Sequence, residues 1–126
     1  MLYAILCYDS EAVTSSWSKE KDDQVMASLG AVTSKIAAQN RLGPVARLMP
    51  TTAATTIRKG KEAMVIDGPF AETKEQLLGF YVIDCASLDA AIDTAKELAR
   101  ASGSAGAFEI RPLRFYHPGL PELGAP

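Results

Sequence analysis

The chain has 126 residues, a net charge of −2, and 48% hydrophobic against 22% charged residues. These values are typical of one globular domain and exclude a disordered chain. A weakly acidic protein has no general attraction to polyanions, so direct nucleic-acid binding is not expected. No apolar stretch reaches the ~18 residues that a membrane span needs, and the N-terminus lacks the basic region of a signal peptide. We therefore expect a cytoplasmic protein without membrane contact.

The first third of the chain predicts a strand and then a long helix. Residues 2–8 are apolar and aromatic and end at Asp9, which predicts a strand that is buried on both faces and central in its sheet. Ser18 is a suitable N-cap for a helix that ends near Asn40. The apolar stripe of that helix consists of Val25, Leu29, Val32 and Ile36.

The middle of the chain predicts short strands. Residues 45–49 and 78–85 are apolar runs of strand length. Residues 55–58 and 61–67 are expected to pair as a β-hairpin that turns at Lys59-Gly60.

The C-terminal third predicts a second helix and a last strand. Ser87 is a suitable N-cap, and the buried stripe of the helix is expected to be Leu88, Ala91, Ile92, Ala95 and Ala99. Residues 108–115 alternate in polarity and contain Pro112, which fits an edge strand. The sequence thus divides into a domain over residues 1–116 and a Pro/Gly-rich tail over residues 117–126, expected to be mobile.

Two strand–helix–strand units follow one another when the hairpin is set aside. This order predicts an α+β fold, a ferredoxin-like βαββαβ sandwich with two helices on one face of an antiparallel sheet and the hairpin as an insertion. The other face of the sheet would be bare in a monomer, so we expect a second subunit to cover it. A homodimer is therefore predicted.

The two cysteines, Cys7 and Cys85, lie far apart and inside apolar runs. This usage indicates reduced, buried thiols and no disulfide framework. No cluster of residues has the spacing of a zinc or calcium site, and we predict neither a metal nor a cofactor.

Residues 67–75 read Asp-Gly-Pro-Phe-Ala-Glu-Thr-Lys-Glu and concentrate charge around a rigid bend. A carboxylate at a strand tip beside Phe70 would be partly desolvated, which suits Asp67 to general acid or base work in a pocket rim. The alternative is a structural turn in which Asp67 binds its own backbone and the other charges face water. Thr73 with Gln76 matches a capping box that could start a short helical turn.

This loop, followed by Leu-Gly-Phe-Tyr-Val-Ile-Asp at residues 78–84, resembles the DGPF subgroup of the YCII-related domain family. The similarity extends to about Phe115 and implies a ferredoxin-like dimeric α+β barrel. It also implies a small-molecule cleft that contains Asp67 as the candidate catalytic residue, with Phe70, Glu72, Thr73 and Lys74 as candidate ligand-binding residues.

The sequence departs from other YCII-related proteins at one position. YCII-related proteins outside the DGPF subgroup pair the aspartate with a histidine of the first helix, whereas Leu29 or a neighbour occupies that position here and His117 lies in the tail. An acid–base mechanism therefore does not transfer, and ligand binding without chemistry stays open. The resemblance also implies an alternative function, that of a non-enzymatic regulatory module associated with extracytoplasmic-function sigma factors.

Five aromatic residues could line a pocket, although strand aromatics more often belong to a core or a dimer interface. They are Tyr3, Tyr8, Trp17, Phe80 and Tyr81.

Overall fold

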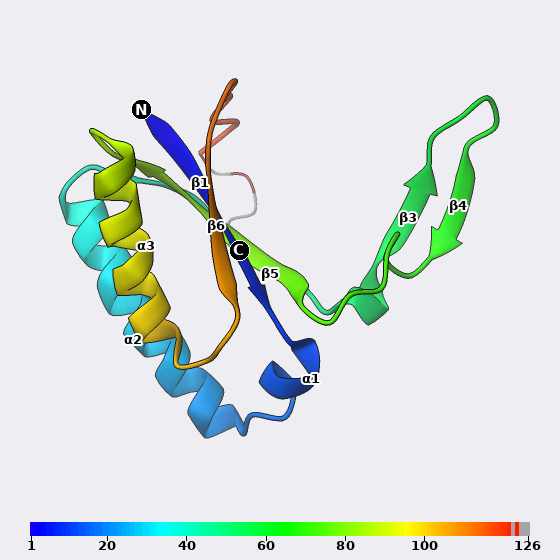
Figure 1. The fold of residues 1–126 in the computed structure, drawn as a ribbon, viewed down its shortest axis with the longest axis horizontal. Coiled ribbons are helices and arrows are strands. Elements are labelled where there is room, and N and C mark those ends of the chain that lie inside the picture. Colours follow the sequence, from blue (N-terminus) through cyan, green and yellow to red (C-terminus); the bar gives the residue numbers. More distant parts are fainter. Residues whose placement is uncertain (122, 124–126) are drawn as a thin grey trace.

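The structure is a computed structural model that describes residues 1–121 and residue 123 (Figure 1). Two long helices and four strands form the body, and a separate hairpin extends from it. The elements in chain order are β1 (Leu2–Asp9), α1 (Glu11–Thr14), α2 (Lys19–Ala38), β2 (Leu42–Arg47), a 3-10 turn (Thr51–Ala53), β3 (Thr55–Arg58), β4 (Met64–Asp67), β5 (Gln76–Asp84), α3 (Leu88–Ser102) and β6 (Ala107–Pro112).

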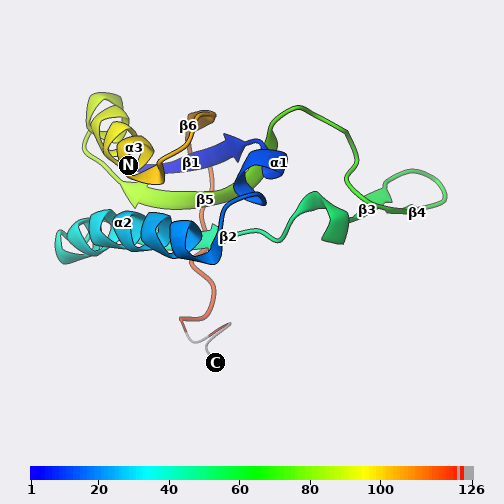
Figure 2. The same cartoon turned by 90° about the horizontal axis from the view of Figure 1, so that it is seen from below.

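The main sheet has the strand order β2-β5-β1-β6, and each neighbouring pair is antiparallel. The predicted antiparallel α+β architecture is confirmed, and this order is compatible with a ferredoxin-like sandwich. β1 is central and β6 lies at an edge, as the sequence predicts. The expectation that β1 is buried on both faces is wrong: Tyr3 and Ile5 are buried, while Leu2, Ala4 and Leu6 on the other face are half-buried. The helices cover one face of the sheet only (Figures 1 and 2).

Both long helices begin at the predicted caps. The hydroxyl oxygen of Ser18 accepts a hydrogen bond from the Lys21 amide, and that of Ser87 accepts one from the Ala90 amide. Such caps satisfy backbone donors that the first turn of a helix leaves free. Between the helices and the sheet lies the core, which contains Tyr3, Ile5, Ile36, Tyr81, Ile83, Cys85, Ala91, Ala95 and Leu98.

The apolar stripes of the two helices differ in how well the sequence predicts them. In α2 the predicted stripe faces the sheet: Ile36 is buried, and Val25, Leu29 and Val32 are half-buried because the N-terminal half of the helix lies over a cavity described below. In α3 the buried face follows Ala91, Ala95 and Leu98, so the inclusion of Leu88 and Ala99 in the stripe was wrong. Leu88 begins α3 and is 52% exposed.

Two further local features differ from the sequence-based expectations. The short helix α1 was not predicted; it is capped by Ser10, whose hydroxyl oxygen accepts from the Val13 amide. The helical turn expected from Thr73 and Gln76 is absent, because Gln76 begins β5 and its side-chain nitrogen donates to the Thr73 carbonyl. Its side-chain oxygen accepts from the Glu11 amide at 2.9 Å, which ties this segment to α1.

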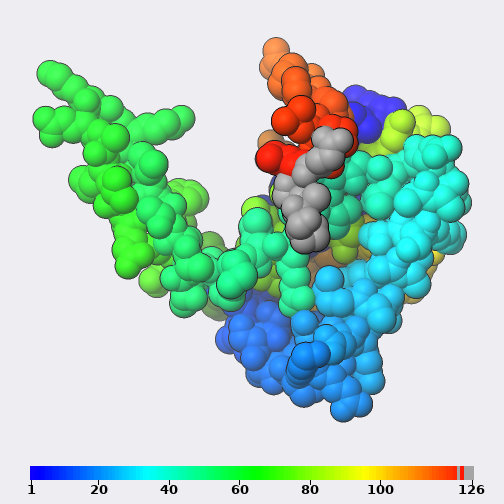
Figure 3. All heavy atoms as spheres, turned by 180° about the vertical axis from the view of Figure 1, so that it is seen from behind, coloured from blue at the N-terminus to red at the C-terminus, as the bar shows by residue number. Residues whose placement is uncertain are grey.

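Residues 48–75 form a protruding segment, called the arm below. Within it β3 and β4 pair as the predicted antiparallel hairpin, with Thr55 opposite Asp67 and Ile57 opposite Val65. The hairpin forms its own two-stranded sheet and projects from the side of the main sheet that the long helices leave free (Figures 1 and 3).

Of the helices that the structure describes, none is both long and apolar enough to cross a membrane.

Candidate functional site

A cavity of about 190 Å³ lies between the main sheet and the N-terminal half of α2. It is comparable in size to an apolar cavity of about 150 Å³ that binds benzene in another protein. Its walls are predominantly apolar, and the loop from α3 to β6 forms part of them. The residues that line the cavity include Cys7, Trp17, Val25, Leu29, Tyr81 and Phe108.

Strand alternation explains how the sheet builds its wall of the cavity. In the antiparallel register Cys7 lies opposite Gly79 on one side and Phe108 on the other, and Tyr81 lies two residues beyond Gly79. Residues separated by two along a strand share a face, so these side chains point toward the helices. Val25 and Leu29, four residues apart on α2, lie on one face of that helix and form the opposite wall.

Two polar groups in the cavity are held in their neutral forms. Burial raises the pKa of the Cys7 thiol from 9.0 to about 12. Burial, with a smaller contribution from Cys7, raises the pKa of Tyr81 from 10.0 to about 12. Removal from water disfavours the charged form of such groups, so both stay protonated at neutral pH. Tyr81 lines the cavity, and its side chain makes no hydrogen bond among the described residues. Because no fully buried polar side-chain atom there lacks a partner, its hydroxyl keeps some accessible surface and can donate one bond to a guest.

An ion pair borders the cavity where β2 faces α2. The Arg47 guanidinium donates to both carboxylate oxygens of Asp22, at 2.8 and 3.2 Å. This hydrogen bonding lowers the pKa of Asp22 and raises that of Arg47. Nearby, Lys21 stacks its ammonium over the Trp17 ring at 5.1 Å from the centroid. Both cations are therefore engaged, and neither is a free charge for a ligand.

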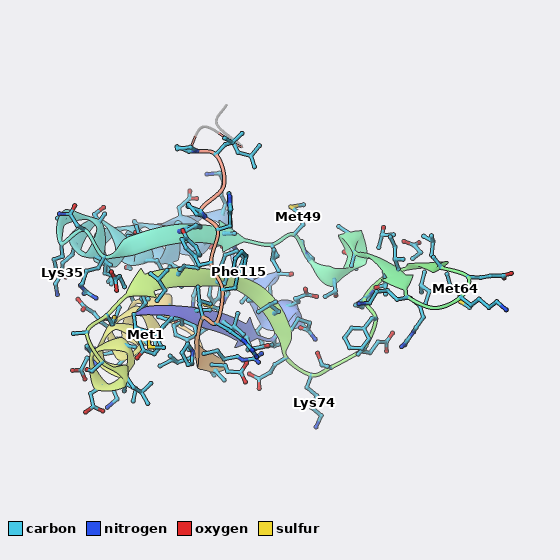
Figure 4. All side chains as sticks on the ribbon, turned by 90° about the horizontal axis from the view of Figure 1, so that it is seen from above. Met1, Lys35, Met49, Met64, Lys74 and Phe115 are labelled. Carbon is cyan, nitrogen blue, oxygen red and sulfur yellow. The ribbon has the colours of Figure 1, made fainter. Side chains whose placement is uncertain are left out.

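The residues predicted from the Asp67 loop lie elsewhere, on the arm. Asp67, Glu72, Thr73 and Lys74 are exposed, and Phe70 is 73% exposed. Figure 4 shows Lys74 and Met64 on the arm, outside the main sheet. The loop itself is ordered by backbone contacts: the Gly68 amide donates to the Ala54 carbonyl at 2.8 Å, and the Thr56 hydroxyl donates to the Gly68 carbonyl at 2.8 Å. None of these five residues lines the cavity.

The structure separates Asp67 from the helix position at which the resemblance suggests a histidine partner. Leu29, the residue predicted there, lines the cavity, whereas Asp67 is on the arm. Within one chain the two positions do not form a pair.

Sequence reasoning anticipated part of the cavity and missed the rest. Four of the five aromatic residues considered for a pocket are among the residues that line it, namely Tyr8, Trp17, Phe80 and Tyr81, while Tyr3 belongs to the core. Alternation along β5 nevertheless turns the side chain of Phe80 to the other face of the sheet from that of Tyr81. Cys7, Asp22 and Arg47 were missed. The alternation of β1 could have indicated Cys7, but nothing in the sequence pairs Asp22 with Arg47, because 25 residues separate them.

Among the described residues no group of three or more His, Cys, Asp and Glu side chains could hold a metal ion.

Comparison with known proteins places the chain in a family. Residues 1–115 match the model of the YCII-related domain. The chain belongs to the YCII-related domain family. It is also similar to an uncharacterized protein of Rhizobium meliloti (strain 1021), with 62% identity over 120 residues that cover 94% of this chain and 97% of that protein. Residues 67–75, called the signature loop below, suggested this family, and the suggestion is thus confirmed.

Proposed function

We propose that this YCII-related protein binds a small, neutral, largely apolar molecule that carries one hydrogen-bond acceptor. The observation that carries the proposal is Tyr81, which lines the apolar cavity and whose side chain makes no hydrogen bond among the described residues. A concave apolar site with few polar groups is the usual form of a small-molecule site. The size of the cavity suits a single substituted ring.

The electrostatics of the cavity support a neutral ligand. Cys7 and Tyr81 stay protonated at neutral pH because their pKa values are raised to about 12. Arg47 is neutralised by Asp22 through two hydrogen bonds. A charged guest would lose its hydration without gaining a free counter-ion, which is costly in an apolar site.

Binding can be tested with two probes of similar shape, toluene and acetophenone, by isothermal titration calorimetry. Both should bind the unmodified protein. Tyr81→Phe should weaken acetophenone binding by about two- to twelvefold, because one hydrogen bond contributes about 0.5–1.5 kcal/mol, and should leave toluene affinity unchanged within error. Leu29→Phe, with Val25→Phe as a second variant, should abolish binding of both probes by filling the cavity.

Asp67→Asn distinguishes the cavity from the signature loop as the ligand site. If the cavity binds the probes, this variant retains both affinities, because Asp67 does not line it. Loss of binding in Asp67→Asn, with binding retained in both cavity-filling variants, would contradict the proposal. It would favour the site implied by the family resemblance, with Asp67 as acid or base and Phe70, Glu72, Thr73 and Lys74 at its rim.

We also propose that the protein is a homodimer in which the free faces of two sheets meet as an α+β barrel. The register places Leu6 beside Phe80, and Phe80 beside Ala46, on the face away from Tyr81 and the helices. These three side chains are half-buried, and none of the described helices packs on this face. An apolar face without a helical layer favours a second subunit. Sedimentation equilibrium at about 10 μM protein should give twice the 13.4 kDa of one chain. A mass of one chain would contradict the dimer.

A further inference from the structure

The arm exposes several large apolar side chains to solvent. Its large apolar residues with more than 40% exposure are Leu48, Met49, Ile57, Met64, Val65 and Phe70. A standard interface buries ~800 Å² per partner, and a set of six large apolar side chains can form its apolar centre. Figure 3 shows the arm standing clear of the body.

The hairpin of the arm lacks the support that small sheets need. β3 and β4 have four residues each and pair only with one another. An isolated two-stranded hairpin is marginally stable in water, and three strands or a packed face are needed for independent stability. The cross-strand pair Ile57–Val65, which should pack against something, is 63% and 69% exposed. The hairpin therefore needs another surface.

The root of the arm is nevertheless held in place. The Glu11 carboxylate accepts hydrogen bonds from the Thr51 amide at 2.8 Å and the Thr51 hydroxyl at 2.7 Å. The Glu11 amide donates to the Gln76 side chain at the other end of the arm. Both chain segments that lead into the hairpin are thus tied to α1, which directs the arm outward from a defined point.

We infer that the arm of one subunit packs against a second copy of this chain, so that the two arms clasp the dimer. This inference rests on the homodimer proposed above. The arm projects from the side where the sheet lacks a helical layer, so a two-fold axis on that side gives each arm the other subunit as its surface (Figure 1). One chain supplies both the apolar arm and a sheet face without a helical layer, and a self-complementary interface requires both partners to come from the same chain.

The balanced charge of the arm argues against a nucleic acid or an anionic membrane as its partner. Within residues 48–75 four basic residues (Arg58, Lys59, Lys61 and Lys74) balance four acidic ones (Glu62, Asp67, Glu72 and Glu75). A nucleic acid or an anionic membrane would be recruited by an excess of positive charge. An apolar, electrically balanced arm fits a protein surface of similar character.

The signature loop then belongs to the contact between subunits. Alternation along the strands puts Thr55 and Asp67 on the same face of the hairpin as Ile57 and Val65. If that face packs on the second copy, Asp67 borders the contact and faces residues of the other subunit. A site that uses Asp67 is therefore incomplete in one chain, which accounts for its exposure here.

Amide hydrogen exchange on the full-length protein tests the arm directly. Amides of residues 55–58 and 64–67 that bond across the hairpin should exchange at least about a hundredfold more slowly than in an unstructured chain at 100 μM protein. Their protection should fall as dilution produces monomer. An unpartnered hairpin would show little protection at every concentration.

A point substitution supplies an independent measurement. Val65→Asp places a charge on the apolar pair and should raise the dimer dissociation constant by at least about thirtyfold in sedimentation equilibrium. Ser34→Asp, on the exposed side of α2, is the matched control and should leave that constant within about twofold. Equal melting temperatures of the two variants at a monomeric concentration would show that the body remains folded.

The outcomes separate the two proposals. Slow, concentration-dependent exchange in the arm together with weaker association of Val65→Asp supports the clasp. A stable dimer with an unprotected arm and no effect of Val65→Asp overturns the clasp and leaves the dimer of sheet faces. A protein that is monomeric at 100 μM overturns both.

Discussion

Replacing Gly79 or Gly106 by alanine is expected to lower the free energy of unfolding by at least about 1–3 kcal/mol, the usual cost of overpacking. A Cβ atom at Gly79 would lie 2.3 Å from the Ala46 carbonyl oxygen, so β2 and β5 would have to separate. At Gly106 it would lie 2.3 Å from the Tyr8 carbonyl oxygen, and the φ of +116° adds strain for any residue with a side chain. Both glycines also line the cavity.

Gly30→Ala is the matched control for these two substitutions. Gly30 lies inside α2, and a Cβ there would have no neighbour within 4 Å. The same change should therefore stabilise the protein by up to about 1 kcal/mol through helix propensity. Urea denaturation of the three variants measures the free energies. Destabilisation by Gly30→Ala, or neutrality of the other two, would contradict the packing described here.

The Cys7 thiol is expected to react with iodoacetamide about a thousandfold more slowly in the folded protein than in the unfolded chain at pH 8. The thiolate is the reactive form, and burial raises the pKa of Cys7 from 9.0 to about 12, so little thiolate exists at that pH. Mass spectrometry of the peptide that contains residue 7 separates its modification from that of Cys85. Comparable rates in 8 M urea and in buffer would show that the thiol is not shielded.

The same pKa shift predicts how stability depends on pH. Above pH 9 the unfolded chain loses the Cys7 proton while the folded protein retains it, so the folded state binds more protons. The free energy of unfolding should therefore fall with rising pH, by up to about 1.4 kcal/mol per pH unit for one proton. Tyr81 adds a second such contribution above pH 10. Cys7→Ala should flatten the curve between pH 9 and 10, and an unchanged slope would contradict this assignment.

The family could be predicted from sequence because its signature is local. Nine consecutive residues from Asp67 to Glu75 identify it, and the match over residues 1–115 confirms the identification. The caps of the two long helices could also be predicted from neighbouring residues, since each depends on a serine and the amide three residues later. These features need no knowledge of distant contacts.

The stripe of α3 shows where local periodicity fails. Alanine-rich helices have several faces of similar polarity, so the sequence does not distinguish a stripe that includes Ala99 from one that includes Leu98. Packing against the sheet decides the matter, because Leu98 is fully buried and Ala99 is exposed. The register between distant strands likewise determines which side chains share a face.

The sequence by itself determined the family, the order of the long helices and the strands, and the existence of a rigid loop around Asp67. All of these depend on neighbouring residues. Only the tertiary structure decided where that loop lies and where the cavity forms. The cavity is assembled from β1, α2, β5 and β6 by long-range strand pairing, and the loop is carried away from it on the arm. Long-range packing separated the residues that identify the family from the cavity best suited to hold a ligand.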